Sequence, residues 1–213
     1  MHGQPETSRI PRYLAIGGHV LAVGLAAAWL ARDGELAPRD LAVLGASAIY
    51  LLRTAFGTLV LLKRRFDPSE AAIVTGLFMV FHLGFAWLAD RSHASLGLTA
   101  AVGAVLYLLG SFLNTGAEVG RHRFKLNPAH RGQLYTGGLF RLSMHVNYFG
   151  DSVLFTGFAL LTGSPWALLV PAAMTAGFVF HHVPALDAYL AERYGAQFEA
   201  WADHTARFVP FVY

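Results

Sequence analysis

The sequence predicts an all-α integral membrane protein, a single helical bundle over residues 1–213 with about six transmembrane helices and a C-terminal amphipathic helix. Two observations predict this class. The 213 residues are 55% hydrophobic and only 14% charged, whereas a typical soluble domain is about 25% charged. Apolar runs close to the roughly 20 residues that a bilayer-crossing helix needs also recur along the chain.

Six such runs are separated by short polar or basic segments. In chain order they cover residues 13–31, 41–62, 71–89, 96–113, 148–162 and 166–183. The fifth run is short, which predicts a tilted or partly interfacial helix. Gly163, Ser164 and Pro165 lie between the last two runs and form a turn signal. The last two spans are therefore expected to form an antiparallel hairpin.

The segment 184–203 has a different pattern. Apolar side chains recur there at steps of three and four residues, with charged residues between them, at Leu186, Leu190, Tyr194, Phe198 and Trp201. This spacing is typical of an amphipathic helix. We expect the helix to lie along the membrane interface or against the bundle.

The basic residues predict the orientation. Most of the 16 Lys and Arg residues flank the spans on the side that holds both termini, and only Arg32, Arg39 and Arg91 flank the other side. The positive-inside rule then predicts that both termini lie in the cytoplasm, and we expect the membrane to be a bacterial inner membrane. The basic pI near 9.4 is ascribed to contacts with lipid headgroups and not to nucleic acid. The chain has no cysteine, which excludes thiolate chemistry, and we expect no metal.

Polar side chains recur where predicted spans meet water. Ionisable groups near the bilayer core are costly and usually mark function. Asn114 and Glu118 lie four residues apart, and so do Asn147 and Asp151, so each pair shares a helix face. A basic run through Lys125 follows Glu118, and the further polar candidates are His181, His182 and Asp187. This layer of acids, amides and cations suits a ligand with phosphates, ribose hydroxyls and an amide.

Each of these groups also has a plainer interpretation. Asp151 can cap its helix, Asn114 and Glu118 can end theirs, and basic flanks are topology signals. His19 and His82 lie inside spans, where hydrogen bonding between helices is the simplest role. A third, non-enzymatic interpretation uses His19, His82 and the pair His181–His182 to bind haem or a quinone.

Three stretches and the closing segment carry a family resemblance. They read Gly110-Ser-Phe-Leu-Asn114-Thr-Gly-Ala-Glu118, Gly137-Gly-Leu-Phe140, Asn147-Tyr-Phe-Gly-Asp151 and Arg207-Phe-Val-Pro-Phe-Val-Tyr213. In order and spacing, this half of the chain resembles steroid 5-alpha-reductases and delta-14 sterol reductases, membrane enzymes of the DUF1295 type. The resemblance implies an NADPH-dependent reductase of a lipid-like enone or alkene. Residues 110–213 would hold the cofactor and residues 1–109 would face the lipophilic substrate.

The resemblance also implies roles for individual residues. The NADPH pocket would be lined by Asn114, Glu118, Lys125, Asn147, Asp151, His181 or His182, and Tyr194. In the steroid reductases an acid and a tyrosine from the N-terminal half polarise the enone, but the first four spans hold no buried acid here. Tyr50 and Arg53 are the candidates for the proton donor, and His82 and Tyr107 are the other polar residues in these spans.

The same segment is distantly similar to isoprenylcysteine carboxyl methyltransferases. Residues 144–150 read Met-His-Val-Asn-Tyr-Phe-Gly where those enzymes have Arg-His-Pro-x-Tyr-x-Gly, and residues 187–195 follow their acid-x-x-Leu-x-x-x-aromatic-Gly pattern. Because the Arg and Pro are missing, the sequence favours the reductase. The alternative is a methyltransferase that uses S-adenosylmethionine on a lipophilic substrate. His145 and the basic loop would then hold the methionine carboxylate, and Asp187 or Glu192 would hold the ribose or ammonium.

Overall fold

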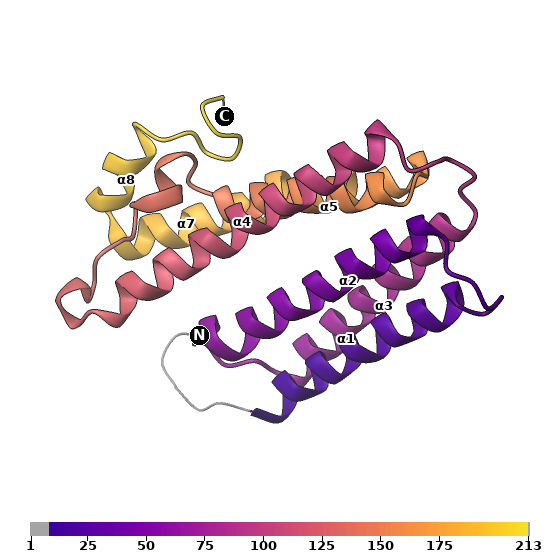
Figure 1. Ribbon diagram of the computed structural model, residues 1–213. Coiled ribbons are helices and arrows are strands. Elements are labelled where there is room, and N and C mark those ends of the chain that lie inside the picture. Colours follow the sequence, from indigo (N-terminus) through magenta and orange to yellow (C-terminus); the bar gives the residue numbers. More distant parts are fainter. Residues whose placement is uncertain (1–8, 213) are drawn as a thin grey trace. The chain divides into compact units, whose positions relative to one another are not determined.

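A computed structural model describes residues 9–212, and each regular element in that range is helical (Figure 1). The predicted all-α class is therefore confirmed. The chain divides into two compact units. Within the described range, unit 1 consists of residues 9–104 and 158–168, and unit 2 consists of residues 105–157 and 169–212.

Eight α-helices are assigned within residues 9–212, with five short 3₁₀ or π segments between them. The α-helices are α1 (Arg9–Leu30), α2 (Pro38–Phe56), α3 (Pro68–Asp90), α4 (Leu98–Leu126), α5 (Val146–Leu161), α6 (Leu169–Gly177), α7 (Val183–Tyr194) and α8 (Ala196–Ala202). The π segments are η1 (Gly57–Leu61) and η5 (Phe178–His182). The 3₁₀ segments are η2 (Pro128–His130), η3 (Gly138–Arg141) and η4 (Pro165–Leu168).

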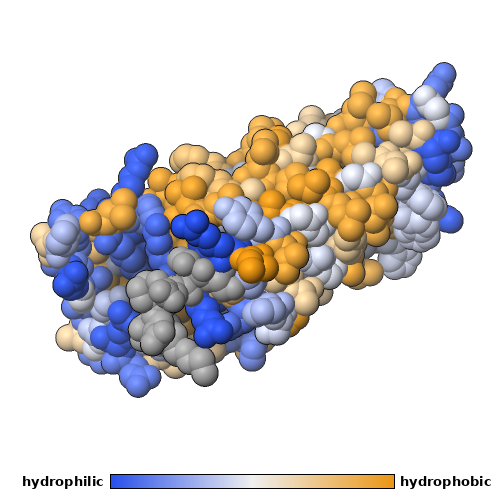
Figure 2. Space-filling view, turned by 90° about the horizontal axis from the view of Figure 1, so that it is seen from below, coloured by the Kyte–Doolittle hydropathy of each residue, from blue (hydrophilic) through white to orange (hydrophobic). Residues whose placement is uncertain are grey.

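Five helical segments are long and apolar enough to cross a membrane. They are Arg9–Leu30, Pro38–Leu61, Pro68–Asp90, Leu98–Leu126 and Pro165–Tyr194. Helix α5 is also apolar but shorter, as the fifth run predicts. Large apolar side chains, among them Leu14, Leu21 and Val80, are exposed on these helices. Figure 2 shows such side chains gathered on the visible face, with hydrophilic side chains beyond them. The helices suit a lipid environment, and the protein is an integral membrane protein.

The helix boundaries follow from local chemistry. Helices α2 and α3 begin at Pro38 and Pro68, because proline fits the first helical turn, where its missing N–H is not needed. The backbone N–H of Ala37 donates to Asp40 Oδ2 at 2.9 Å, which ties the start of α2. Proline therefore defines the start of both helices more sharply than hydrophobicity does, and the capping Asp40 adds to this at α2.

Two helical segments extend beyond their predicted ends. Helix α4 continues past residue 113 to Leu126, so the predicted site residues that follow residue 113 lie on a regular helix. The last span runs from Pro165 through the π segment η5 to Tyr194. Gly195, with a φ of +48°, then breaks the helix, since the left-handed region suits glycine. The predicted helix 184–203 is thus α7, continuous with the span, followed by α8.

Helices α1, α2 and α3 pack together in unit 1 (Figure 1), and a chain of polar side chains runs between them. His19 Nε2 lies 2.7 Å from His82 Nε2, and both rings are at least 99% buried. Thr54 Oγ1 lies 2.9 Å from His19 Nδ1, and Ser47 Oγ lies 3.0 Å from His82 Nδ1. His19 and His82 therefore join helices by hydrogen bonds, the plainer of their two predicted roles.

The direction of these bonds follows from Thr54. Its hydroxyl donates to the carbonyl oxygen of Tyr50 at 2.9 Å, so we assign it as the acceptor for His19 Nδ1–H. His82 Nε2–H then donates to His19 Nε2, and the Ser47 hydroxyl donates to His82 Nδ1. Both imidazoles are neutral in this assignment and each ring nitrogen is satisfied, as burial in an apolar bundle requires.

Replacing His82 with leucine will destabilise unit 1. The change removes a donor and an acceptor at once and leaves His19 Nε2 and the Ser47 hydroxyl without these partners. Leaving a buried polar group unsatisfied costs about 1–3 kcal/mol. Thermal denaturation in detergent, followed by circular dichroism, should show a lower Tm for His82→Leu. Val80→Leu, at an exposed position on the same helix, is the matched control. Equal Tm values for the two variants would contradict the assigned bonds.

Candidate functional site

The site in unit 2 begins with a close crossing of α4 and α5. A β-carbon on Gly150 would lie 2.6 Å from the backbone nitrogen of Asn114 and 2.9 Å from the carbonyl oxygen of Gly110. A β-carbon on Gly110 would in turn collide with the backbone of Gly150 and Leu154. Glycines permit such close contact between membrane helices. The crossing brings the polar side chains that follow Gly110 within hydrogen-bond distance of those on either side of Gly150.

The four amide and carboxylate residues predicted on these helices form one network. Asn114 Nδ2 donates to Asp151 Oδ2 at 2.9 Å and to the carbonyl oxygen of Asn147 at 3.0 Å. Asn147 Nδ2 donates to Glu118 Oε1 at 3.0 Å, and Glu118 also pairs with Arg121. Because the polar residues are four apart on each helix, they lie on the facing sides of α4 and α5 and form successive contacts between the two helices.

A second cluster is centred on Asp187 of α7. His145 Nε2–H donates to Asp187 Oδ1 at 2.7 Å, and Arg207 Nε donates to Asp187 Oδ2 at 2.7 Å. His145 is 99% buried, whereas the side chain of Arg207 is 37% exposed. The carboxylate is thus fixed on both oxygens by groups from two other segments, which lie 42 and 20 residues away in the sequence.

The segment after α8 holds this cluster in place. Backbone N–H groups of Met144 and His145 donate to the carbonyl oxygens of Ala206 and Arg207, at 2.8 and 3.1 Å. The Ser143 hydroxyl donates to the carbonyl oxygen of Phe208 at 2.7 Å. We call residues 206–208 the C-terminal strap. The strap positions Arg207 and supports the backbone that carries His145.

Helix α8 packs against the segment that precedes His145. Trp201 Nε1–H donates to the carbonyl oxygen of Phe140 at 3.3 Å, and the backbone N–H of Leu134 donates to Gln197 Oε1 at 3.0 Å. Trp201 belongs to a hydrophobic core with Leu113, Ala117, Phe140, Met144 and Val146. The apolar face predicted for residues 184–203 thus packs within unit 2.

Aromatic rings extend from His145 along η5. His145 stacks on Tyr148 with ring centroids 5.9 Å apart, and Tyr148 stacks on Phe178 at 4.7 Å. His182 contacts the edge of Phe178 at 5.9 Å, and His181 contacts His182 at 5.2 Å. The predicted histidine pair is therefore connected to His145 through two rings. The side chains of both histidines are exposed.

The remaining predicted residues fall in two places. Lys125 lies within electrostatic reach of Glu118, Arg121 and Arg193, and the Arg193 guanidinium lies over the ring of Tyr194 at 5.6 Å. Lys125 and Tyr194 therefore border the same basic edge of unit 2. Tyr50 and Arg53 are in unit 1, where the Arg53 guanidinium lies over the Tyr50 ring at 5.1 Å. Their role as proton donors stays a prediction.

Sequence reasoning assigned no role to three residues of this site. Arg207 stands only within the closing motif and Tyr148 only within the stretch 147–151, while Phe178 is one of three aromatic residues in the sixth run. The sequence signal that could have identified Arg207 is its position, after the aromatic residues of the predicted helix 184–203 and before Pro210. Only the fold shows that its partner is Asp187.

The fold and these clusters define a polytopic helical membrane protein with two clusters of bonded polar side chains, one on α4 and α5 and one around Asp187. The chain belongs to the DUF1295 family, a family of steroid 5-alpha-reductase-like proteins that carries the description "protein of unknown function", and its profile matches residues 70–205. The matched region starts in α3 and includes each predicted cofactor residue.

Three relatives are named as methyltransferases. Over 94 residues, 44% of this chain, the sequence is 34% identical to the probable O-methyltransferase ustE of Ustilaginoidea virens. Over 115 residues, 52% of this chain, it is 26% identical to protein-S-isoprenylcysteine O-methyltransferase A of Arabidopsis thaliana and 25% identical to the B form. The chain spans 33% of the first relative and 58% of the other two.

The helix crossing gives a test of the site's architecture. Gly150→Ala places a methyl group against the backbone of α4 and forces the helices apart, which costs about 1–3 kcal/mol by overpacking. We expect a lower Tm in detergent. Gly177→Ala is the control, since a β-carbon there meets nothing within 4 Å and replacing a helical glycine stabilises by roughly 0.5–1 kcal/mol. The close crossing is wrong if both variants behave alike.

Proposed function

We propose that this protein is a membrane methyltransferase that transfers a methyl group from S-adenosylmethionine to a lipophilic substrate. One observation carries the proposal. The two segments that resemble the methyltransferase motifs, residues 144–150 and 187–195, are joined by the 2.7 Å bond between His145 and Asp187. The similarity to named methyltransferases supports the same reaction.

The side chains of unit 2 fit the chemistry of this cofactor. S-adenosylmethionine carries an ammonium, a carboxylate, ribose hydroxyls and a sulfonium, so it needs both acidic and basic partners. Asp187 and Arg207 supply one of each. In addition, Ser111 Oγ and Thr115 Oγ1 are buried and have no hydrogen-bond partner among residues 9–212. They lie on α4 beside Asn114 and Glu118, where a polar ligand would satisfy them.

Each group of the cluster has a role in this proposal. Asp187 would accept a hydrogen bond from the ammonium or a ribose hydroxyl, and Arg207 would hold the carboxylate. His145 and the strap would keep Asp187 oriented, while the rings of Tyr148 and Phe178 would exclude water. When bound, the cofactor supplies an electrophilic methyl group, which passes to the substrate nucleophile as the sulfur leaves as a thioether. Holding the two reactants in line is the main contribution of the protein.

A second candidate is the NADPH-dependent reductase. The observation that favours it is the bonded network of Asn114, Glu118, Asn147 and Asp151, the residues that the reductase resemblance places in one pocket. Lys125 and Arg121 would hold a phosphate group in that case. NADPH would supply a hydride, and Tyr50 or Arg53 would supply the proton.

The two functions differ in which cofactor stabilises the purified protein. A ligand at 100 times its Kd adds about 2.7 kcal/mol to folding stability. Thermal denaturation in detergent should show a higher Tm with S-adenosylmethionine or S-adenosylhomocysteine and no change with NADPH. A shift with NADPH alone would replace the methyltransferase by the reductase.

Asp187→Asn should weaken S-adenosylmethionine binding. The variant keeps the shape of the side chain but removes its charge, and hydrogen bonds to charged groups are worth about 1.5–3 kcal/mol. Isothermal titration should therefore give a Kd roughly 10- to 100-fold higher. Glu199→Gln makes the same chemical change at an exposed position on α8 and should leave Kd unchanged. Equal affinities of Asp187→Asn and the unaltered protein would remove Asp187 from the site.

Substrate specificity is tested by activity. A small S-prenylated cysteine is the first substrate to try, because the Arabidopsis relatives are named for that chemistry. The readout is transfer of the labelled methyl group into the organic phase. We expect transfer by the unaltered protein and by Glu199→Gln, and at least a tenfold loss in Asp187→Asn. Binding of the cofactor without transfer to this compound would keep methyl transfer but exclude this substrate class.

A further inference from the structure

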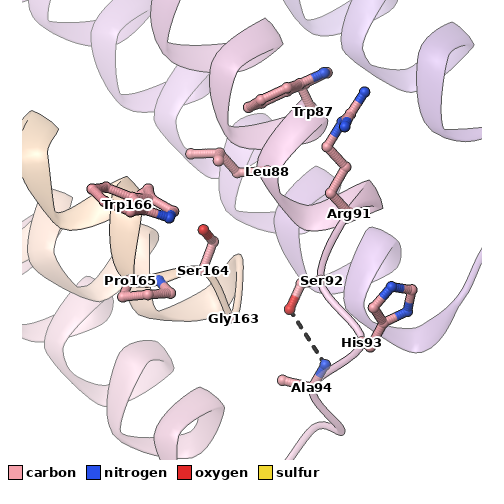
Figure 3. Close-up of a pocket in the computed structure, with 10 residues that line it drawn as sticks. All are labelled: Trp87, Leu88, Arg91, Ser92, His93, Ala94, Gly163, Ser164, Pro165 and Trp166. Atoms are coloured by element: carbon pink, nitrogen blue, oxygen red, sulfur yellow. Dashed lines mark hydrogen bonds between the residues drawn. The ribbon is translucent and has the colours of Figure 1, made fainter.

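Unit 1 contains a pocket at the end of α3. It has a volume of about 360 Å³ and is lined by side chains within residues 87–94 on one side and 163–166 on the other (Figure 3). The first set comes from the last turn of α3 and the loop after it. The second set comes from the turn that follows α5 and from the start of η4. The pocket therefore lies where two candidate membrane spans end and begin, which is the depth of lipid headgroups.

The walls of this pocket are held by a buried arginine. Arg39, which is 6% exposed, donates to the carbonyl oxygens of Ala94 at 2.8 Å, Ser95 at 2.9 Å and Leu161 at 2.7 Å. Gly163 has a φ of +71°, and a β-carbon there would collide with the Arg39 guanidinium. Arg39 thus ties the loop after α3 to the turn after α5, so the pocket is preformed.

The charge around the pocket is positive. Arg91 and His93 line it, and no Asp or Glu does. Arg39 has no carboxylate within ion-pair distance in the part of the chain that the structure describes, and the nearby Asp90 is paired with Arg32 at 3.0 Å. A buried guanidinium without a counter-charge is costly. An anion in the pocket would offset this cost.

Both sides of the pocket also carry apolar and aromatic side chains. The indoles of Trp87 and Trp166 are 44% and 70% exposed, and the Arg91 guanidinium lies over the Trp87 ring at 4.5 Å. Figure 3 shows Trp166 and Leu88 pointing toward each other, with the Ser164 side chain between the two walls. Tryptophan is enriched at the boundary between lipid and water. The face of its ring also attracts a cation such as the Arg91 guanidinium, and this cation can in turn bind an anion.

From this arrangement we propose that the pocket binds the phosphodiester headgroup of an anionic phospholipid. The phosphate contacts Arg91 and His93, with the hydroxyls of Ser92 and Ser164 as further donors. The glycerol and the first methylenes of the acyl chains lie along Trp87, Leu88 and Trp166. A free phosphate would meet the same arginine and histidine but would leave the apolar side chains unused, so the structure favours the lipid.

The test uses the full chain in a neutral detergent. Phosphatidylglycerol, phosphatidylcholine or glycerol 3-phosphate is added at equal concentration, and both Tm and bound lipid, by native mass spectrometry, are measured. We expect phosphatidylglycerol to raise Tm more than phosphatidylcholine does, and to remain bound. Arg91→Gln combined with His93→Gln should lose at least half of that difference. Arg131→Gln, which removes an exposed arginine of unit 2, should retain it.

Three results would overturn the proposal. One is an equal effect of the two lipids on the unaltered protein. Another is an unchanged preference for phosphatidylglycerol in the double variant, since the guanidinium and the imidazole of the pocket are then both absent. The third is a full shift with glycerol 3-phosphate, which has no acyl chains and would show that the apolar side chains contribute nothing. None of these outcomes bears on methyl transfer, because the assay needs no cofactor.

Discussion

Hydrocarbon offers no hydrogen bonds, so a polar group inside a membrane helix bundle must find its partner in the protein. This constraint accounts for most of the specific contacts seen in both units. Arg12 donates to the carbonyl oxygens of Thr58 and Arg64, and Arg39 donates to three others. The two buried histidines of unit 1 satisfy one another and two hydroxyls. In unit 2, Asn114 donates to two acceptors and Asn147 donates to Glu118. Because partners are needed, a polar residue that enters the bundle fixes the position of a second one.

The fold could be predicted largely from composition and from runs of apolar residues. The spacing of four residues between Asn114 and Glu118, and between Asn147 and Asp151, correctly placed each pair on a helix face. Helix ends were less predictable. Helix α4 continues past residue 113 because Asn114, Thr115 and Glu118 are compatible with a helix although they are not apolar. Hydrophobicity measures preference for lipid, and a helix can extend into water.

The contacts of the site were harder to predict than its residues. Asp187 and His145 were both candidates, but periodicity carries no information on side chains that are 42 residues apart. The same is true of Arg207, whose role depends on the strap, and of the bond between His19 and His82. The two resemblances overlap at residues 147–150 and 194–195, and a dinucleotide and S-adenosylmethionine share ribose hydroxyls and a need for acidic and basic partners. The relatives, rather than the residue types, favour methyl transfer.

The π segment η5 sets the direction in which Asp187 points. A π turn holds one more residue than an α turn, and here it lies between Phe178 and His182, just before the helix that carries the acid. Each residue advances an α-helix by about 100° around its axis. If the same residues instead wound as a regular α-helix, the extra residue would rotate each later side chain by about that angle, and the carboxylate would turn away from His145 and Arg207. The register of the last helix therefore depends on a backbone irregularity and not on any one side chain.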